Sequence, residues 1–206
     1  MIISHYGLGM VKIQQGDWVV AFNPIGKGAD QEVVKFGADL ALVSLSDAGY
    51  AGVEQVSRAD RVPFVIDGPG EYEVEGNLIR GFATIGPGQK INTVYLLQLE
   101  GARLVHLGAL AEAELSNETV EALGTIDILF APLAEPAEGG LGPKGAAKLA
   151  TKLEPRVIVP VNFSSSSLAL FLKEMGEEKL EAVESWTVKK KELSEKAGDV
   201  VVIKSF

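Results

Sequence analysis

The chain has 206 residues and a formal charge of −9, with 28 acidic against 19 basic residues and 47% hydrophobic residues. This length and composition predict one globular domain, and the acidic balance argues against nucleic acid or membranes as partners. Because the chain has no cysteine, disulfides, thiolate zinc sites and cysteine nucleophiles are excluded. No apolar run approaches the roughly 20 residues that span a bilayer, and the N-terminus lacks a signal-peptide pattern, so we expect a cytoplasmic protein.

The first half of the chain is predicted to consist of short strands separated by tight turns. The expected strands are Ile2–Tyr6, Met10–Ile13, Trp18–Phe22, Leu40–Ser44, Phe64–Ile66, Glu71–Val74, Leu78–Phe82, Thr93–Leu99 and Arg103–Leu107. Gly76 and Gly101 each lie between two of these strands, in Glu75-Gly76-Asn77 and Glu100-Gly101-Ala102. Both segments are typical of β-hairpin turns.

The second half alternates strands with helices. Helices are predicted from the N-cap Ser116 to about Leu123, over Pro143–Leu153 and over Leu168–Met175; strands are predicted at Ile126–Phe130, Val157–Val161, Trp186–Val188 and Val200–Ile203. Hairpins followed by β-α units indicate two sheets with helices outside them, in one α/β sandwich over residues 1–206. A site is expected where strand ends meet along one edge.

Chemically informative residues are few. Gly7-Leu8-Gly9 and Gly86–Lys90 lack the strand and helix context of nucleotide-binding loops, so we interpret both as turns. The chain has two histidines, His5 and His106. His106 ends a predicted buried strand, and we interpret it as a structural histidine, with a ligand role as the alternative.

Several motifs, in their order and spacing, resemble the metallo-β-lactamase fold. They are Tyr6-Gly7-Leu8-Gly9, Ala21-Phe22-Asn23-Pro24, Ala38–Ser44, Asp67–Val74, Asn92–Tyr95, His106-Leu107-Gly108, Ile126–Leu129 and Glu154–Pro160. The chain looks closest to the small bacterial branch of zinc-dependent hydrolases related to ascorbate-phosphate lactonases. This resemblance implies a four-layer αββα sandwich with a one- or two-zinc hydrolytic site at one edge. In such a site, imidazoles and carboxylates hold the metal and an open position carries the attacking water.

The metal-binding signature implied by the resemblance is H-x-H-x-D-H after a buried strand. Its four ligand positions correspond here to Leu45, Asp47, Gly49 and Tyr50. Among them, only Asp47 offers a metal-binding carboxylate. Leu45 is apolar and Gly49 has no side chain, so this segment lacks most of the ligands the signature requires.

The remaining ligand positions of the family have also changed. The bridging aspartate of its H-L-G-D motif corresponds to Ala109, the last histidine to Asn162, and a histidine of the first turn to Leu8. Because zinc needs three or four protein ligands, we expect no metal, no cofactor and no catalytic residue at these positions. Without ligands to satisfy, Leu8, Leu45, Tyr50 and Phe163 are available to pack the former pocket.

The leading hypothesis is a metal-free, catalytically inactive member of this fold that acts in binding or assembly. Its partner would be a small molecule or a protein, self-association included, and its polar handles would be Asp47, Tyr50, His106 and Asn162. The alternative is a hydrolase of a phosphate- or lactone-containing small molecule with an atypical metal site, in which Asp47 and His106 act as base, acid or ligands. A nucleic-acid-processing relative is disfavoured by the acidic charge.

Overall fold

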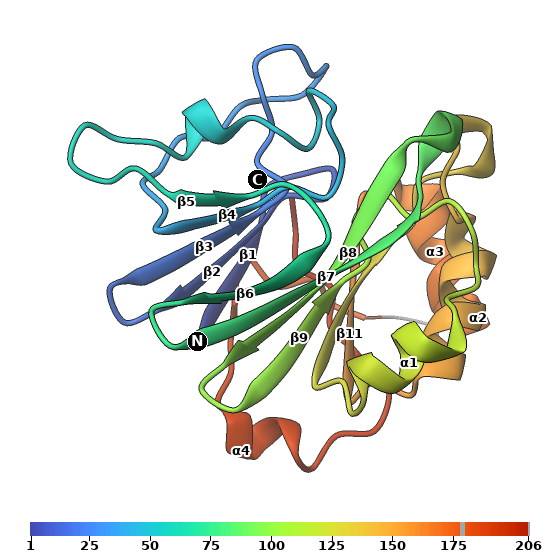
Figure 1. The fold of residues 1–206 in the computed structure, drawn as a ribbon. Helices are drawn as coiled ribbons and strands as arrows, with labels where there is room; N and C mark the ends of the chain where they lie inside the picture. The colour runs from blue at the N-terminus through green and yellow to red at the C-terminus, as the bar shows by residue number, and fades with distance from the viewer. Residues whose placement is uncertain (178–179, 206) are drawn as a thin grey trace.

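The computed structural model describes residues 1–177 and 180–205. In these residues two mixed sheets face each other (Figure 1). The first sheet has the order β12-β1-β2-β3-β4-β5 and the second the order β13-β11-β10-β9-β8-β7-β6. The strands of the first sheet are β1 (Ile2–His5), β2 (Val11–Gln15), β3 (Trp18–Phe22), β4 (Leu40–Leu42), β5 (Phe64–Ile66) and β12 (Trp186–Thr187). The second sheet contains β6 (Gly70–Val74), β7 (Asn77–Ile85), β8 (Ile91–Leu99), β9 (Ala102–His106), β10 (Ile128–Pro132), β11 (Val157–Val161) and β13 (Asp199–Val200).

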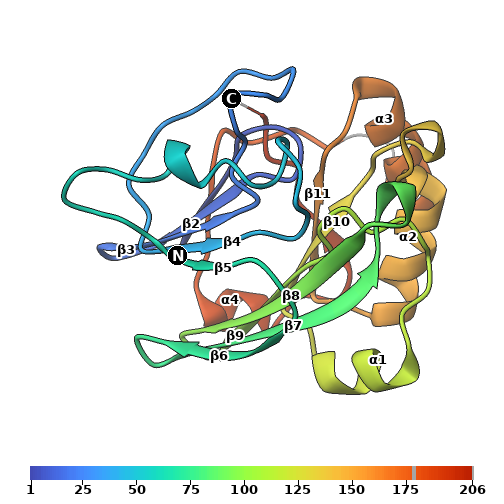
Figure 2. The ribbon, with the colours of Figure 1, turned by 45° about the horizontal axis from the view of Figure 1, so that its top comes forward.

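Helices cover the outer side of the second sheet (Figure 2). They are α1 (Asn117–Leu123), α2 (Gly142–Leu153) and α3 (Ser165–Glu174), while the short α4 (Lys190–Leu193) lies at one end of the sandwich. Single 3₁₀ turns occur at η1 (Val53–Gln55), η2 (Pro87–Gln89) and η3 (Pro136–Glu138). Ser116 caps α1, as predicted, because its hydroxyl accepts the Thr119 N–H at 3.1 Å.

Several predicted boundaries differ from the structure: β4 ends at Leu42, β7 and β8 are longer than predicted, and β10 spans Ile128–Pro132. Helix α3 begins at Ser165, three residues before the predicted start, because Ser164 forms a capping box with Ser167. The Ser164 hydroxyl accepts the Ser167 N–H at 3.1 Å, and the Ser167 hydroxyl accepts the Ser164 N–H at 2.9 Å. The predicted tail strand 200–203 is shortened to β13, after which Ile203 makes an isolated bridge to Val183 instead.

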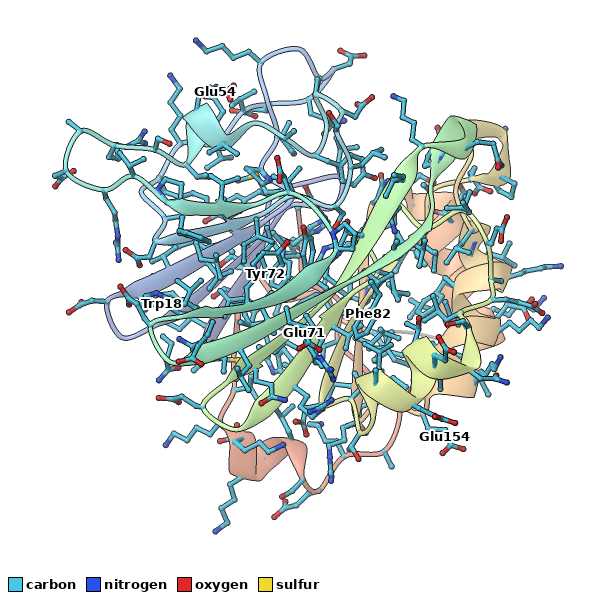
Figure 3. All side chains as sticks on the ribbon, viewed as in Figure 1. Trp18, Glu54, Glu71, Tyr72, Phe82 and Glu154 are labelled. Carbon is cyan, nitrogen blue, oxygen red and sulfur yellow. The ribbon has the colours of Figure 1, made fainter. Side chains whose placement is uncertain are left out.

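Three apolar layers hold the sandwich together. The largest fills the space between the sheets, with Phe22, Tyr95 and Phe130 fully buried in it. Trp18 and Tyr72 pack against this layer, whereas Phe82 contacts the layer between the second sheet and the helices (Figure 3). Burial of this much apolar surface is the main stabilising term of the fold.

The outer cover of the first sheet differs from the expected helical layer. The segment 23–62 packs on that sheet through a small apolar cluster, and within the described residues its regular structure is β4 and the turn η1. A close backbone contact inside the segment explains the irregular path. The Gly52 N–H donates to Pro24 O at 2.7 Å, and a Cβ on Gly52 would lie 2.2 Å from Gly26 N. The two sheets and the helical layer confirm the αββα architecture, except that loops take the place of helices in the outer layer of the first sheet.

The two ends of the chain meet in the first sheet. Strand β1 lies between β2 and β12, with Ile2 opposite Thr187. The N-terminal ammonium donates to Val188 O at 2.9 Å, and His5 forms a bridge with Ser205. The first strand is thus completed by residues from the last tenth of the sequence.

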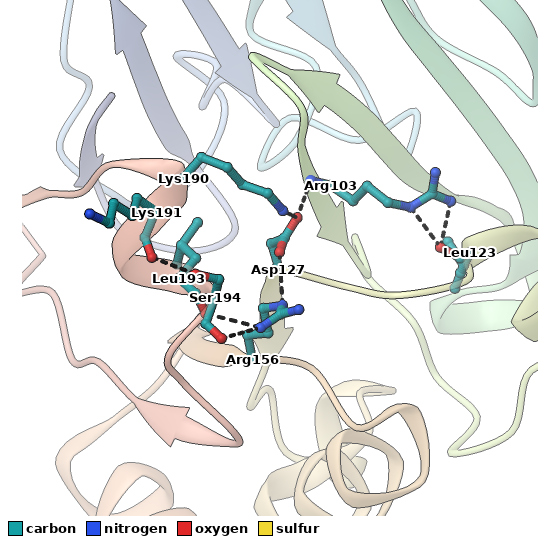
Figure 4. Close-up of polar contacts among 8 residues, drawn as sticks. All are labelled: Arg103, Leu123, Asp127, Arg156, Lys190, Lys191, Leu193 and Ser194. Atoms are coloured by element: carbon teal, nitrogen blue, oxygen red, sulfur yellow. Dashed lines mark hydrogen bonds and ion pairs between the residues drawn. The ribbon is translucent and has the colours of Figure 1, made fainter.

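A buried carboxylate fixes the end of the sandwich near α4 (Figure 4). Asp127 is 1% exposed and accepts the Arg103 N–H at 2.8 Å. It forms ion pairs with Lys190 and with Arg156, whose Nε lies 3.1 Å from Oδ1. This arrangement ties α4 to the starts of β10 and β11, because a buried charge requires such partners.

Candidate functional site

A cavity of about 500 Å³ opens at the edge where parallel strands end. Residues that follow β4, β9, β10 and β11 line it, together with the β1–β2 and β7–β8 turns. The seven positions that the resemblance assigned to metal ligands are all among its lining residues: Leu8, Leu45, Asp47, Gly49, Tyr50, Ala109 and Asn162. The structure thus brings these positions together as one surface, and a function for them stays a prediction.

The cavity is open, and of the two states that the sequence left possible, packed by apolar side chains or open to a ligand, the structure has the second. Leu8, Leu45 and Tyr50 line its wall without closing it. Phe163 is not a lining residue; its ring packs on His5, with centroids 5.5 Å apart. A volume of this size suits a small organic molecule.

Asp47 and Lys90 form an ion pair at the cavity. Lys90 Nζ lies 3.2 Å from Asp47 Oδ2, and Gly49 N–H donates to Asp47 Oδ1 at 3.3 Å. The Gly49 N–H and the Lys90 ammonium lower the pKa of Asp47, so this carboxylate is ionised at neutral pH. In a metal site the Asp47 carboxylate would bind the metal ion, but here it pairs with the Lys90 ammonium.

Tyr50 and Asn162 form a second polar pair. Asn162 Nδ2 donates to Tyr50 Oη at 3.3 Å, linking the loop after β4 to the end of β11. Burial raises the pKa of Tyr50 to about 12, and the charges of Asp47 and Glu138 act in the same direction. The Tyr50 hydroxyl therefore keeps its proton and can donate a hydrogen bond.

Two residues at the cavity have left-handed backbone conformations. Leu8 has φ 43° and Asn162 has φ 51°, and the Asn162 N–H donates to Leu8 O at 2.7 Å. Asparagine tolerates this region, but leucine does so rarely, at a cost of about 1–2 kcal/mol. The surrounding contacts therefore impose the geometry of the turn on Leu8.

His106 lies behind the cavity in the core, and this corrects its place among the polar handles. It is 0% exposed and stacks between Phe22 and Phe130, with centroids 5.2 and 5.5 Å away. Its Nε2–H donates to Gly9 O at 2.9 Å, and its Nδ1 accepts the Gly108 N–H at 2.9 Å. Both ring nitrogens are used internally, as the structural interpretation predicted.

The buried residues behind the cavity form its floor, and two buried asparagines support this floor. Asn23 Oδ1 accepts the Ser44 N–H at 2.8 Å, and Asn23 Nδ2 lies 3.4 Å from His106 Nδ1. Asn92 Oδ1 accepts the Ala109 N–H at 2.7 Å, and its Nδ2 donates to Leu107 O at 3.0 Å. These amides thus satisfy backbone groups at the strand ends, as buried polar groups require.

The buried His106 predicts a loss of stability in mild acid. Burial lowers the pKa of His106 to about 3, whereas an unfolded histidine titrates near 6.5. Below about pH 6.5 the unfolded state therefore binds the extra proton, and folding becomes less favourable as the pH falls. We expect the free energy of unfolding to be about 1.4 kcal/mol lower at pH 5.5 than at pH 7.5 from this residue.

Urea denaturation at both pH values measures this difference, and nitrogen NMR of the His106 ring reports its protonation. The ring should remain the neutral Nε2–H form in the folded protein at pH 5.5. A ring that titrates near pH 6.5 in the folded state would contradict the burial argument. His5 contributes in the same direction because burial also lowers its pKa.

Lys90 is a residue of the site that was not predicted from the sequence. It is the lysine of Gly86–Lys90, interpreted correctly as a turn, and it sits just after η2 between β7 and β8. Its partner Asp47 is 43 residues away in sequence. No local pattern links the two, and the fold alone brings them together. Glu138 also lines the cavity without a sequence signal.

The residues present do not fit the metal centre of the fold. In residues 1–177 and 180–205, no group of three or more His, Asp or Glu side chains is placed to hold a metal ion. Asp47 already pairs with Lys90, and His106 is engaged by Gly9 and Gly108. Catalytic zinc requires about three protein ligands and an open position.

Comparison with known proteins identifies the class. The family model of the Beta-lactamase superfamily domain matches residues 3–162, and the chain therefore belongs to the β-lactamase superfamily. No curated protein matches the chain.

Solved structures share the same fold. A candidate Zn-dependent hydrolase of the metallo-β-lactamase superfamily from Thermotoga maritima is 24% identical, with a TM-score of 0.78 over 100% of this chain and 99% of that one. A candidate metal-dependent hydrolase from Parabacteroides distasonis is 15% identical, with a TM-score of 0.69 over 99% and 93%. The isothiocyanate hydrolase from Delia radicum gut bacteria is 10% identical, with a TM-score of 0.66 over 92% and 100%. At these identities the likeness establishes the fold alone.

As for membranes, none of the helices in the described part of the chain is both long and apolar enough to cross one.

Proposed function

We propose that this chain is a metal-free member of the superfamily that binds a small molecule in the cavity instead of hydrolysing it. One observation carries the proposal: the seven positions aligned with metal ligands surround an open volume of about 500 Å³ and supply few groups that bind metal. Their polar atoms pair within the protein, through Asp47–Lys90 and Tyr50–Asn162. A cavity with apolar walls and a few placed polar groups is typical of small-molecule sites.

The two polar pairs give the cavity its handles. Tyr50 and Asn162 line the cavity as a hydrogen-bonded pair. Asp47 also lines it and is held by Lys90 and by the Gly49 N–H. His106 is not one of the handles, because it lies in the core. Binding of a protein partner or of a second copy of the chain, at a surface that the sequence does not specify, stays a prediction.

Zinc stoichiometry tests the proposal. Untagged protein is incubated with excess zinc, desalted and analysed for metal per chain. We expect well below one equivalent for the wild type and no change in Asp47→Asn, because a lone carboxylate paired with Lys90 cannot hold zinc. Added zinc should also leave the thermal midpoint unchanged, since only a ligand bound to the folded state raises it.

Retention of one or two equivalents in the wild type, reduced in Asp47→Asn, would contradict a metal-free site. Zinc-dependent hydrolysis of a lactone or phosphate ester by the same sample would then favour the alternative, a hydrolase with an atypical metal site. Turnover that persists in Asp47→Asn would point to metal carried by another protein in the preparation.

A further inference from the structure

The pairing of Tyr50 with Asn162 leaves hydrogen-bond donors and an acceptor of the two side chains for a ligand. Asn162 Nδ2 donates to Tyr50 Oη. Among the described residues this is the one side-chain hydrogen bond of the pair, so it leaves the hydroxyl hydrogen of Tyr50, the second N–H of Asn162 and Asn162 Oδ1 unused. The hydroxyl is protonated, as its raised pKa requires. Two neighbouring residues of the cavity lining therefore retain unused donors and an unused amide oxygen.

Rotation of the Asn162 amide by half a turn preserves this result. In that orientation the Tyr50 hydroxyl donates to Oδ1, which leaves the lone pairs of Tyr50 Oη and both N–H groups of Asn162 unused. The pair again retains both donors and acceptors. The pair therefore suits a ligand group that offers an acceptor and a donor on a single edge.

The charges around the cavity select against anions. Among the described residues its lining contains the carboxylates of Asp30, Asp47 and Glu138 and one ammonium, that of Lys90. That ammonium already faces Asp47 at 3.2 Å. An incoming carboxylate or phosphate would lose its hydration and meet unpaired negative charge, which is unfavourable. The apolar groups of Leu8, Leu45 and Leu110 favour an uncharged ligand with an apolar body.

A primary carboxamide meets both requirements. Its NH₂ group always places one hydrogen on the same edge as its carbonyl oxygen. An open-chain secondary amide does not, because its trans geometry puts the N–H and the C=O on opposite edges. From this geometry we propose that the cavity recognises an uncharged primary carboxamide carried on an apolar body, with Tyr50 and Asn162 as the residues that bind the amide edge. This inference rests on the proposed small-molecule binding role.

Four matched probes test it: 3-phenylpropanamide, its N-methyl amide, its N,N-dimethyl amide and the 3-phenylpropanoate anion. Each is titrated into isotope-labelled protein, and shifts of the Gly49, Ala109 and Asn162 backbone amides report binding at the cavity. Given the small size of the probes, we expect a millimolar dissociation constant for the primary amide. The other three should bind at least about 10-fold more weakly, because each leaves a polar group unpaired or brings a charge.

Tyr50→Phe is the diagnostic variant, and Tyr72→Phe is its control. Tyr72 donates to Gly68 O and Pro69 O away from the cavity. Tyr50→Phe should weaken the primary amide about 10-fold and remove its advantage over the N-methyl amide, whereas Tyr72→Phe should preserve both. The ratio between the two amides separates recognition from a general structural effect.

Three outcomes would overturn the inference. If all four probes bind the cavity equally, small-molecule binding stands and amide recognition fails. If the anion binds best, the charge argument is wrong. If the primary amide causes no shift at the cavity at about 20 mM, several times the dissociation constant expected for its size, amide recognition is excluded, while the metal-free proposal still depends on the zinc measurement.

Discussion

Gly108→Ala should lower the free energy of unfolding by about 4 kcal/mol, from crowding in a packed interior and a left-handed backbone. Gly108 has φ +66°, and a Cβ there would lie 2.3 Å from Asn92 Oδ1 and 2.6 Å from Ser44 Cβ. Asn92 cannot retreat without losing the Ala109 N–H that it accepts at 2.7 Å. Urea denaturation measures the loss, and the thermal midpoint should fall by about 10 °C for a chain of this size.

Gly101→Ala separates the two contributions. Gly101 has φ +74°, but a Cβ at this position would have no atom within 4 Å. This variant should lose only the backbone term of about 1 kcal/mol. An equal loss of unfolding free energy in both variants would contradict this prediction. It would show that Asn92 and Ser44 move away from the added methyl group at no cost.

Asp127→Ala is the second substitution with a large expected effect, a loss of about 3 kcal/mol. The change leaves Lys190, Arg156 and the Arg103 N–H without their shared acceptor. The loss stays near the lower end of the range for broken buried pairs because the Lys190 and Arg156 side chains are 42% and 32% exposed and can regain water. Chemical denaturation at pH 7.5 provides the measurement.

Asp199→Ala is the matched control for that substitution. Asp199 also pairs with a lysine, Lys196, but its side chain is 42% exposed. Exposed pairs contribute at most about 1 kcal/mol, so this variant should remain close to the wild type. Amide hydrogen exchange adds a second test: Asp127→Ala should increase exchange in α4, since Lys190 belongs to that helix. A loss in Asp127→Ala no larger than in Asp199→Ala would contradict the buried-charge argument.

Most strands were predictable because their signals are local. The alternating burial of β2 and the continuous apolar runs of β10 and β11 have the expected periods. The start of α3 was misjudged because Ser164 to Ser167 looks like a loop until the reciprocal hydrogen bonds of Ser164 and Ser167 are known. The irregular cover of the first sheet was also missed, since the contact of Gly52 with Gly26 joins distant parts of a segment with no strong period.

The site was predictable only as a set of positions. The spacing of the family motifs located seven of the residues that line the cavity, because the ends of parallel strands converge wherever this fold forms. It did not locate Lys90, whose role depends on the length of the β7–β8 hairpin. The motif spacing also left His106 either a structural residue or a ligand. Its stacking on Phe22 and Phe130 in the core favours the structural role.

The closure of the first sheet by residues from both ends of the chain has a consequence during synthesis. Strand β1 is made before the other strands described here, yet its neighbour β12 begins only at Trp186. Until residues beyond 185 have emerged from the ribosome, β1 presents an unpaired edge to other nascent chains, and such edges promote misassembly. A stalled or truncated chain that lacks residues beyond 185 would keep this edge open, which makes it a natural substrate for chaperones and proteases.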